Sequence, residues 1–256
     1  MKYKLTVLVL SFIFLCCESD NYNSLGPSVC CFINFTHKWN ESTVNASNFN
    51  TIQYTNAFGN QLSIERLRYL ISEIKVTKAN GEIIVISNYS LLDLQDDSSL
   101  KIASNQWLLP GPYNDISFVF GFTNEANNDG AYPDLNSASW NVPPMLGGGY
   151  HYMQLDGKYL NGSGVEVGYN YHAIRAAENS GVNPTFPQDT FFEVSLGPTT
   201  LSNNGEIRIV MNIAKWFEQP NLWDLNIYNQ MLMPNSEAQI MMYENGQNVF
   251  YLESIE

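Results

Sequence analysis

Histidine supplies the clearest candidate chemistry in this chain of 256 residues. The chain holds three histidines, His37, His151 and His172. Each lies in or beside a stretch of alternating apolar residues, which is typical of a β-strand. Neutral imidazole is a common ligand of copper and zinc, and imidazoles from different strands would hold a metal rigidly. The alternative is that each histidine is a hydrogen-bonded structural residue.

Met153 follows His151 by two residues, so in a continuous strand the two side chains would share one face. Thioether sulfur is a soft ligand that suits Cu(I). The pattern therefore predicts a metal site formed by His37, His151 and His172, with Met153 as a further ligand.

Motifs of the common enzyme classes are absent from the sequence: it has no G-x-S-x-G, no H-E-x-x-H, no P-loop and no dinucleotide-binding G-x-G-x-x-G after a strand. Residues 125–136 place oxygen ligands at alternate positions, as a calcium loop does, but Asn136 stands where a bidentate glutamate should be. A plain acidic loop is therefore favoured. A carboxylate pair for glycoside hydrolysis stays open, because its spacing is set in three dimensions. The sequence indicates a binding protein and no enzyme.

Charge and cysteine content exclude two further classes. The formal net charge is −13, with only 12 Lys and Arg, so a nucleic-acid backbone would find no basic surface. The chain has four cysteines, in two adjacent pairs. Cys16 and Cys17 stand at the end of an apolar run, and Cys30 and Cys31 follow further along the chain. No disulfide framework is expected, and a hydrophobic core must hold the fold together.

The N-terminus has the layout of an export signal. Lys2 and Lys4 precede an apolar run over residues 5–15, which is too short to anchor in a bilayer. We expect a signal peptide over 1–16, lipidation at Cys17 and a polar tether over 17–30. This predicts a lipoprotein of the bacterial cell envelope, anchored in the outer membrane and facing the periplasm or the cell surface. Cys16 as the lipidated residue and an ordinary secretory signal are the alternatives.

Short alternating segments separated by Gly, Pro and Asn predict the rest of the fold. Strands are expected at 31–36, 62–76, 83–86, 116–122, 150–155, 165–172, 190–196 and 206–213. Residues 62–76 also match helical spacing, but Asn80-Gly81 and the return strand after it favour a hairpin. Residues 236–245, with a Ser cap, predict a short helix. The fold class is all-β: one β-sandwich domain over 31–256 with Greek-key-like short strands and a short C-terminal helix.

Several segments together resemble the MbnP-like family, in its Bacteroidetes lipoprotein branch. They are PPMLGGGYHYMQLDGKY (143–159), YNYHA (169–173), INFTHKW (33–39), LSIERLRYLISEIKV (62–76) and NIAKWFEQPNLWDLN (212–226). Family members are exported proteins named for the copper-binding protein of methanobactin operons. The resemblance implies a β-rich extracytoplasmic domain that binds one copper ion as Cu(I), for capture, storage or delivery, without catalysis. His151 and His172 fall within the family-like segments.

The resemblance also implies a modified tryptophan. In copper-binding members, a di-haem peroxidase-like partner oxidises a tryptophan of a W-x-W motif to kynurenine, which supports copper binding. Trp140 stands at that place here, but Asn141 and Val142 follow it, so the second tryptophan is missing.

Two rivals to copper binding remain on the sequence alone. Abundant Tyr and Trp suit a surface lipoprotein that binds glycans or proteins and holds no metal. A purely structural envelope protein would also fit.

Overall fold

The computed structural model describes residues 27–253 of the chain. The predicted signal peptide over 1–16 and the lipidation at Cys17 lie outside these residues. The first strand begins at Val29, so Val29 and Cys30, which we assigned to the tether, belong to the folded domain. Within residues 27–253, no helix is both long enough and apolar enough to cross a membrane.

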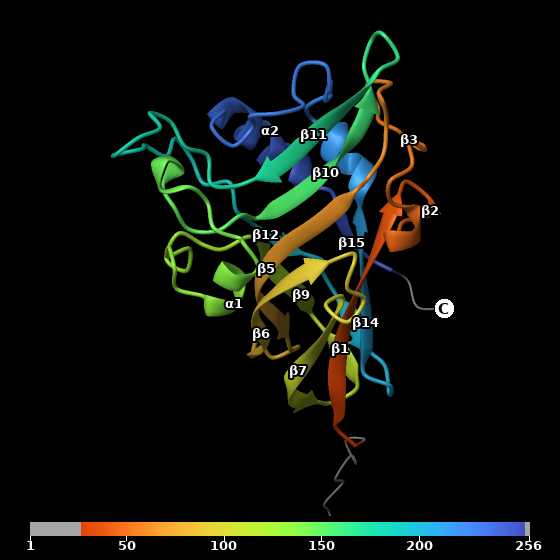
Figure 1. Cartoon of the computed structure of the whole chain (residues 1–256). Helices are drawn as coiled ribbons and strands as arrows, with labels where there is room; N and C mark the ends of the chain where they lie inside the picture. The colour runs from red at the N-terminus through yellow and green to blue at the C-terminus, as the bar shows by residue number, and fades with distance from the viewer. Residues whose placement is uncertain (1–26, 254–256) are drawn as a thin grey trace, which may run out of the picture.

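Two large β-sheets and a small one form the domain (Figure 1). One large sheet contains β1 (Val29–Trp39), β2 (Ser42–Thr43), β7 (Lys101–Leu108), β14 (Glu206–Asn212) and β15 (Phe250–Leu252). The other contains β3 (Tyr54–Thr55), β4 (Gln61–Leu62), β5 (Arg66–Thr77), β6 (Ile83–Asp93), β9 (Asp115–Phe120), β10 (Met153–Leu160), β11 (Glu166–Ala173) and β12 (Phe192–Ser195). The small sheet pairs β8 (Gly111–Tyr113) with β13 (Thr199–Leu201).

Helices are few and short. The α-helices are α1 (Pro133–Ser137) and α2 (Ser236–Gly246), and the 3₁₀ turns are η1 (Ala46–Asn48), η2 (Pro144–Leu146) and η3 (Ile213–Phe217). The predicted all-β, sandwich-like class with a short C-terminal helix is confirmed. The predicted cap of α2 is off by one residue, because Asn235 and not Ser236 accepts the hydrogen bond from Ala238 N.

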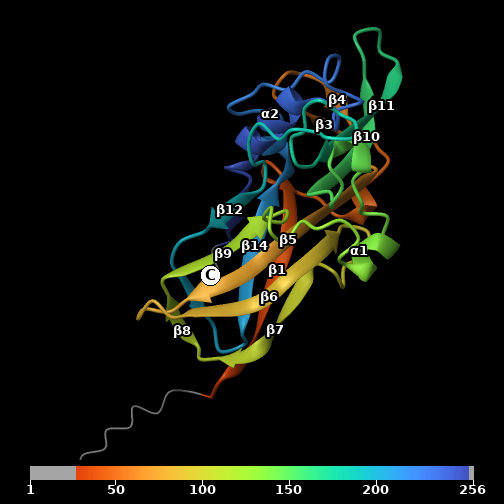
Figure 2. The ribbon, with the colours of Figure 1, turned by 90° about the vertical axis from the view of Figure 1, so that its left-hand side faces the viewer.

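β5 is the organising strand of the larger sheet. Its residues 66–69 pair with β10, its residues 71–77 pair with β9, and β6 pairs along its other edge. Figure 2 shows β9, β5 and β6 side by side. The predicted hairpin through Asn80-Gly81 is confirmed, since β5 and β6 pair antiparallel and Gly81 takes the positive φ (84°) that its turn requires.

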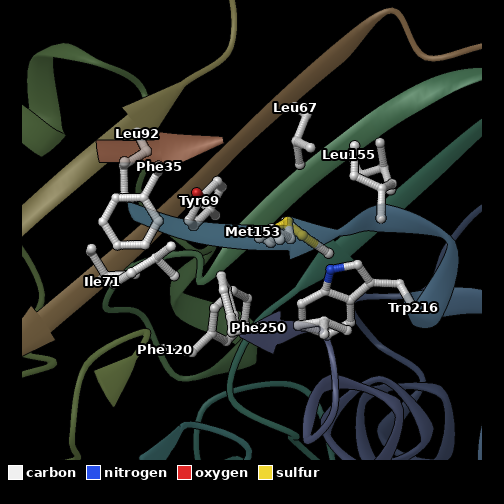
Figure 3. Close-up of a cluster of buried hydrophobic side chains, with 14 of the residues drawn as sticks. Phe35, Leu67, Tyr69, Ile71, Leu92, Phe120, Met153, Leu155, Trp216 and Phe250 are labelled. Carbon is white, nitrogen blue, oxygen red and sulfur yellow. The ribbon is translucent and has the colours of Figure 1, made fainter. Parts of the chain in front are cut away.

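Alternation along β10 and β11 gives this sheet two different faces. On the inner face, Met153, Leu155 and Tyr171 belong to the main hydrophobic core, which the strands of both large sheets share. Figure 3 shows Met153 among Tyr69, Trp216 and Phe250 in that core. Residues at the intervening positions point to the outer face.

The segment between β9 and β10 covers part of the outer face. Its residues Phe122, Leu135, Trp140 and Tyr150 pack with Leu70 of β5 as a second hydrophobic cluster. A smaller cluster of Val142, Leu146 and Ile174 packs against Met233. The end of β10 and β11 that carries His172 adjoins these clusters, and this is where the candidate site lies.

Candidate metal centre

His151 and His172 lie next to each other on the outer face of the sheet. His172 is on β11, opposite Gln154 of β10, and His151 stands two residues before β10 begins. The centroids of the two imidazole rings are 5.5 Å apart and the ring planes cross at 82°. The structure thus brings together two of the four residues that the sequence suggested as metal ligands.

The hydrogen bonding of His151 fixes which ring nitrogen is free. Its backbone N and its Nδ1 lie 3.0 Å and 2.9 Å from the carbonyl oxygen of Trp140. Because a carbonyl only accepts hydrogen bonds, Nδ1 carries the proton and Nε2 keeps an unshared electron pair. The Nε2 atom is buried and has no hydrogen-bond partner. An imidazole held by one nitrogen with the other one free is the arrangement found in metal-binding histidines.

His172 is also held by a hydrogen bond at one ring nitrogen, which here is Nε2 instead of Nδ1. Its Nε2 lies 2.8 Å from Oδ1 of Asp156. Asp156 also accepts hydrogen bonds from Asn170 (2.5 Å) and Arg66 (2.6 Å). Since an ionised carboxylate only accepts, Nε2 of His172 donates, and in the neutral imidazole Nδ1 is then the electron-pair donor.

The pKa values of the site agree with this arrangement. Burial is the main cause that lowers the pKa of His151 to about 4; His172 and Arg68 act in the same direction, while the Trp140 carbonyl and Asp156 oppose them. Burial alone would raise the pKa of Asp156, but His172, Asn170 and Arg66 together lower it to about 2. At neutral pH the site therefore pairs an uncharged His151 with an ionised Asp156.

Trp140 packs directly beside His151. It is fully buried, its ring centroid is 5.6 Å from that of His151, and its Nε1 has no hydrogen-bond partner. The guanidinium of Arg68 lies 5.0 Å over the indole ring, and its Nη2 donates to Gln154 at 2.6 Å. These contacts fix the peptide whose carbonyl orients His151.

The structure places His37 and Met153 in the core between the two large sheets, away from His151 and His172: His37 lies on β1 of the facing sheet and Met153 on the inner face of β10. His37 Nε2 shares a 2.9 Å hydrogen bond with the hydroxyl of Tyr69, and burial lowers the pKa of His37 to about 3. Met153 is fully buried in the core, opposite Tyr69. The shared face expected for His151 and Met153 is wrong, because β10 begins only at Met153 and the backbone N of His151 donates to Trp140 instead of entering the strand.

A cavity of about 470 Å³ adjoins His172 and was missed by the sequence reasoning. Its lining is mostly apolar and includes three methionines, Met145, Met231 and Met233. The other lining residues are Leu146, Asn170, His172, Leu232 and Pro234. The methionines come from two loop segments far apart in the chain, which carry no periodic signal. The presence of Met145 within the family-like segment 143–159 was the one hint.

Within residues 27–253, no group of three or more His, Cys, Asp and Glu side chains could hold a metal ion. In the calcium-like loop, the side-chain oxygens of Asn127 and Asn136 accept hydrogen bonds from the backbone N and the hydroxyl of Tyr150. Two imidazoles with soft neighbours fit Cu(I), which accepts few ligands, better than they fit four-coordinate Zn²⁺ or oxygen-bound Ca²⁺.

Comparisons with known proteins agree with this architecture. The model of the family described as MbnP matches residues 31–241 of the chain. The solved structure of MbnP from Methylosinus trichosporium superposes with a TM-score of 0.55 at 12% sequence identity, covering 76% of this chain and 79% of that one. At this identity the likeness concerns the fold. A search of curated proteins found no match.

Proposed function

Because the chain belongs to the MbnP family, we propose that it binds a single copper ion, as Cu(I), through His151 and His172. The role is copper capture, storage or delivery outside the cytoplasm, with no reaction catalysed. One observation carries the proposal: two neighbouring imidazoles are each held through one nitrogen, by Trp140 or Asp156, and the buried Nε2 of His151 has no hydrogen-bond partner.

The surroundings of the two histidines suit a cation of low charge. Asp156 supplies one negative charge behind His172, while Arg68 lies on the side of Trp140. Burial keeps His151 uncharged at neutral pH, so copper does not have to displace a proton from Nε2. His151 is buried and little of the His172 side chain is exposed, which limits the contact of a bound ion with water and favours Cu(I) over the more strongly hydrated Cu(II).

The cellular setting belongs to the same proposal. The signal peptide over 1–16 is removed, Cys17 carries the lipid, and the domain is tethered to the outer membrane of a bacterial envelope. Trp140, beside His151, is the residue whose oxidation to kynurenine stays open in this proposal, because the second tryptophan of the motif is missing. An increase in mass of the Trp140 peptide in protein from its native envelope would add the di-haem peroxidase-like partner to this proposal.

The test is an anaerobic Cu(I) titration of the mature chain against a competing chelator, with metal content measured on protein from the native envelope. We expect near-stoichiometric copper in the wild type and losses of affinity of at least about 100-fold in His151→Ala and in His172→Ala, since a lost ligand costs more than a lost supporting group. His37→Gln is the matched control and should bind copper normally. Unchanged affinity in both outer-face variants would overturn the assignment.

A second candidate, glycan binding, is favoured by a separate cavity of about 530 Å³ on the outer face. Three aromatic rings, Tyr89, Phe122 and Tyr132, line it together with polar Glu73 and Asn88. Aromatic rings and hydrogen-bonding groups around one hollow suit sugar rings. Affinity electrophoresis in glycan-containing gels tests this: retardation that persists with a copper chelator and disappears in Tyr132→Ala would favour it.

A further inference from the structure

We propose that Trp107 and the uncharged surface around it contact the membrane to which the chain is anchored, at the depth of the lipid headgroups. The domain is then oriented with this end toward the lipid and with the histidine pair away from it. The inference rests on the lipid anchor of the proposed function and adds to it a second point of contact with the same phospholipid surface.

Trp107 differs from the other tryptophans of the chain. It is 71% exposed, whereas Trp39, Trp140, Trp216 and Trp223 are at most 6% exposed. An indole combines an apolar ring with one N–H donor, and this combination suits the boundary between lipid chains and water. The exposure of Trp107 therefore fits an interfacial contact, since the residue contributes little to the core.

Trp107 lies at the end of the domain where the chain enters it. β7 pairs antiparallel with β1, and in this register Trp107 is opposite Cys30 and Leu108 is opposite Val29, the first residue of β1. Leu108 is buried, so strand alternation directs Trp107 to the outside. Figures 1 and 2 both show the start of β1 and β7 at one end of the molecule.

The segments that meet at this end contain no charged side chains. Charged residues make up 14% of the chain, but the segments 27–36, 102–114 and 196–205 have none. They meet because β7 pairs with β1, β8 pairs with β13, and the backbone N of Phe32 donates to the carbonyl of Gly205 at 2.6 Å. A net charge of −13 repels anionic lipids, so an uncharged end is the part of this protein that approaches them at the lowest electrostatic cost.

The anchor makes a weak contact sufficient. Residues 18–28 separate Cys17 from β1 and can span at most about 40 Å when fully extended. Attachment within this distance raises the effective concentration of the domain at the lipid surface to the order of millimolar. One indole, which would hold a free protein only weakly, is then enough to orient an attached one.

This orientation has a consequence for the histidine pair. β10, β11 and α2 lie toward the opposite end of the molecule from the start of β1 (Figures 1 and 2). A domain that contacts the membrane through Trp107 therefore presents His151 and His172 on the side away from the lipid, where a copper donor or acceptor in solution reaches them.

Quenching of tryptophan fluorescence by brominated lipids tests the contact, because the other four tryptophans are buried. The full mature chain is reconstituted in vesicles of phosphatidylethanolamine and phosphatidylglycerol, with or without bromine on the acyl chains. We expect the brominated lipids to quench the wild type and to leave Trp107→Phe unchanged. Replacing an exposed side chain has little effect on stability. Wild-type fluorescence that is not quenched would overturn the inference.

A tryptophan placed toward the opposite end is the matched control. Ile227→Trp is made in the Trp107→Phe background, because Ile227 is 69% exposed and its neighbour Asn226 accepts a hydrogen bond from the backbone N of Gly162, in the β10–β11 turn. We expect no quenching of this variant by brominated lipids. Equal quenching at positions 107 and 227 would show that the domain has no preferred orientation, and it would overturn the inference.

The outcomes separate this inference from the proposed function. If the chain carries its lipid but Trp107 is not quenched, the contact is wrong and the anchor stands. If intact mass shows no lipid at Cys17, the anchor is wrong, and the unlipidated chain at saturating vesicle concentration decides the contact by the same readout. A blue shift of Trp107 fluorescence with rising protein concentration, without vesicles, would show that a second copy covers the residue, and the membrane contact would be wrong. None of these measurements involves copper, so the histidine assignment does not affect them.

Discussion

The core between the two large sheets and the outer face of the larger sheet contain the same residue types in different environments. In the core, His37 of β1 bonds to the Tyr69 hydroxyl on the facing β5, and Met153 of β10 is fully buried. On the outer face, His151 leaves a buried nitrogen without a partner, and methionines line an open cavity beside His172. Histidine and methionine are therefore fully used in packing and hydrogen bonding in the core, whereas on the outer face they keep unused bonding capacity or remain accessible. What distinguishes them is unused bonding capacity and access.

The largest effect should come from the inner methionine. Met153→Ala removes a fully buried side chain from the core and should lower the free energy of unfolding by roughly 2–5 kcal/mol, through lost transfer energy and a cavity. Met145→Ala, at a side chain that is 57% exposed, should change it by less than about 0.5 kcal/mol. Urea denaturation of the copper-free chain measures both. Equal losses would contradict the distinction between the faces.

Replacing Asp156, whose carboxylate accepts a hydrogen bond from His172, should weaken metal binding. Asp156→Asn lacks the charge that holds Nε2 of His172, so we expect Cu(I) affinity to fall by roughly 10- to 100-fold. Glu193→Gln is the matched control, because that carboxylate pairs with Lys75 and lies outside the site. Competition with a Cu(I) chelator measures both affinities. Equal affinities in the two variants would show that Asp156 does not orient the ligand.

The inner histidine should be visible in the pH dependence of stability. Burial lowers the pKa of His37 to about 3 from an ordinary value of 6.5, so the unfolded chain takes up a proton that the folded chain does not. Above pH 6.5, His37 therefore does not change the free energy of unfolding. As the pH falls from 6.5 towards 3, His37 lowers the free energy of unfolding by about 1.4 kcal/mol per pH unit. His37→Gln keeps a hydrogen-bonding group for Tyr69 and should flatten that slope. Urea midpoints between pH 7 and 4 measure it, and identical slopes would refute it.

Much of the fold was readable in the sequence because alternation and turn chemistry are local. The apolar positions 67, 69 and 71 of the segment 62–76, followed by Asn80-Gly81, indicated the β5–β6 hairpin that the structure contains. β7 was missed, since Ser104, Asn105 and Gln106 interrupt its apolar pattern. The first residues of the strand predicted at 150–155 were assigned wrongly, because a contact with Trp140, distant in the sequence, takes their backbone out of the sheet.

Half of the candidate site could be predicted. In YNYHA, the aromatic side chains of Tyr169 and Tyr171 alternate with Asn170 and His172, which places His172 opposite the core side. The same alternation in β10 separates Met153 from Asp156 and would have excluded Met153 as a ligand. The methionine cavity was beyond such reasoning, because no sequence pattern reports that two loops meet at one strand end.

The smallest expected effect concerns the strain on the outer face. Met231 adopts a φ of 57°, which asparagine tolerates better, so Met231→Asn should raise the free energy of unfolding by roughly 0.5 kcal/mol. Met231→Leu, with the same backbone requirement, should bring no gain. Thermal unfolding of both variants tests this, and an asparagine variant no more stable than the wild type would show that the left-handed backbone at Met231 carries no strain.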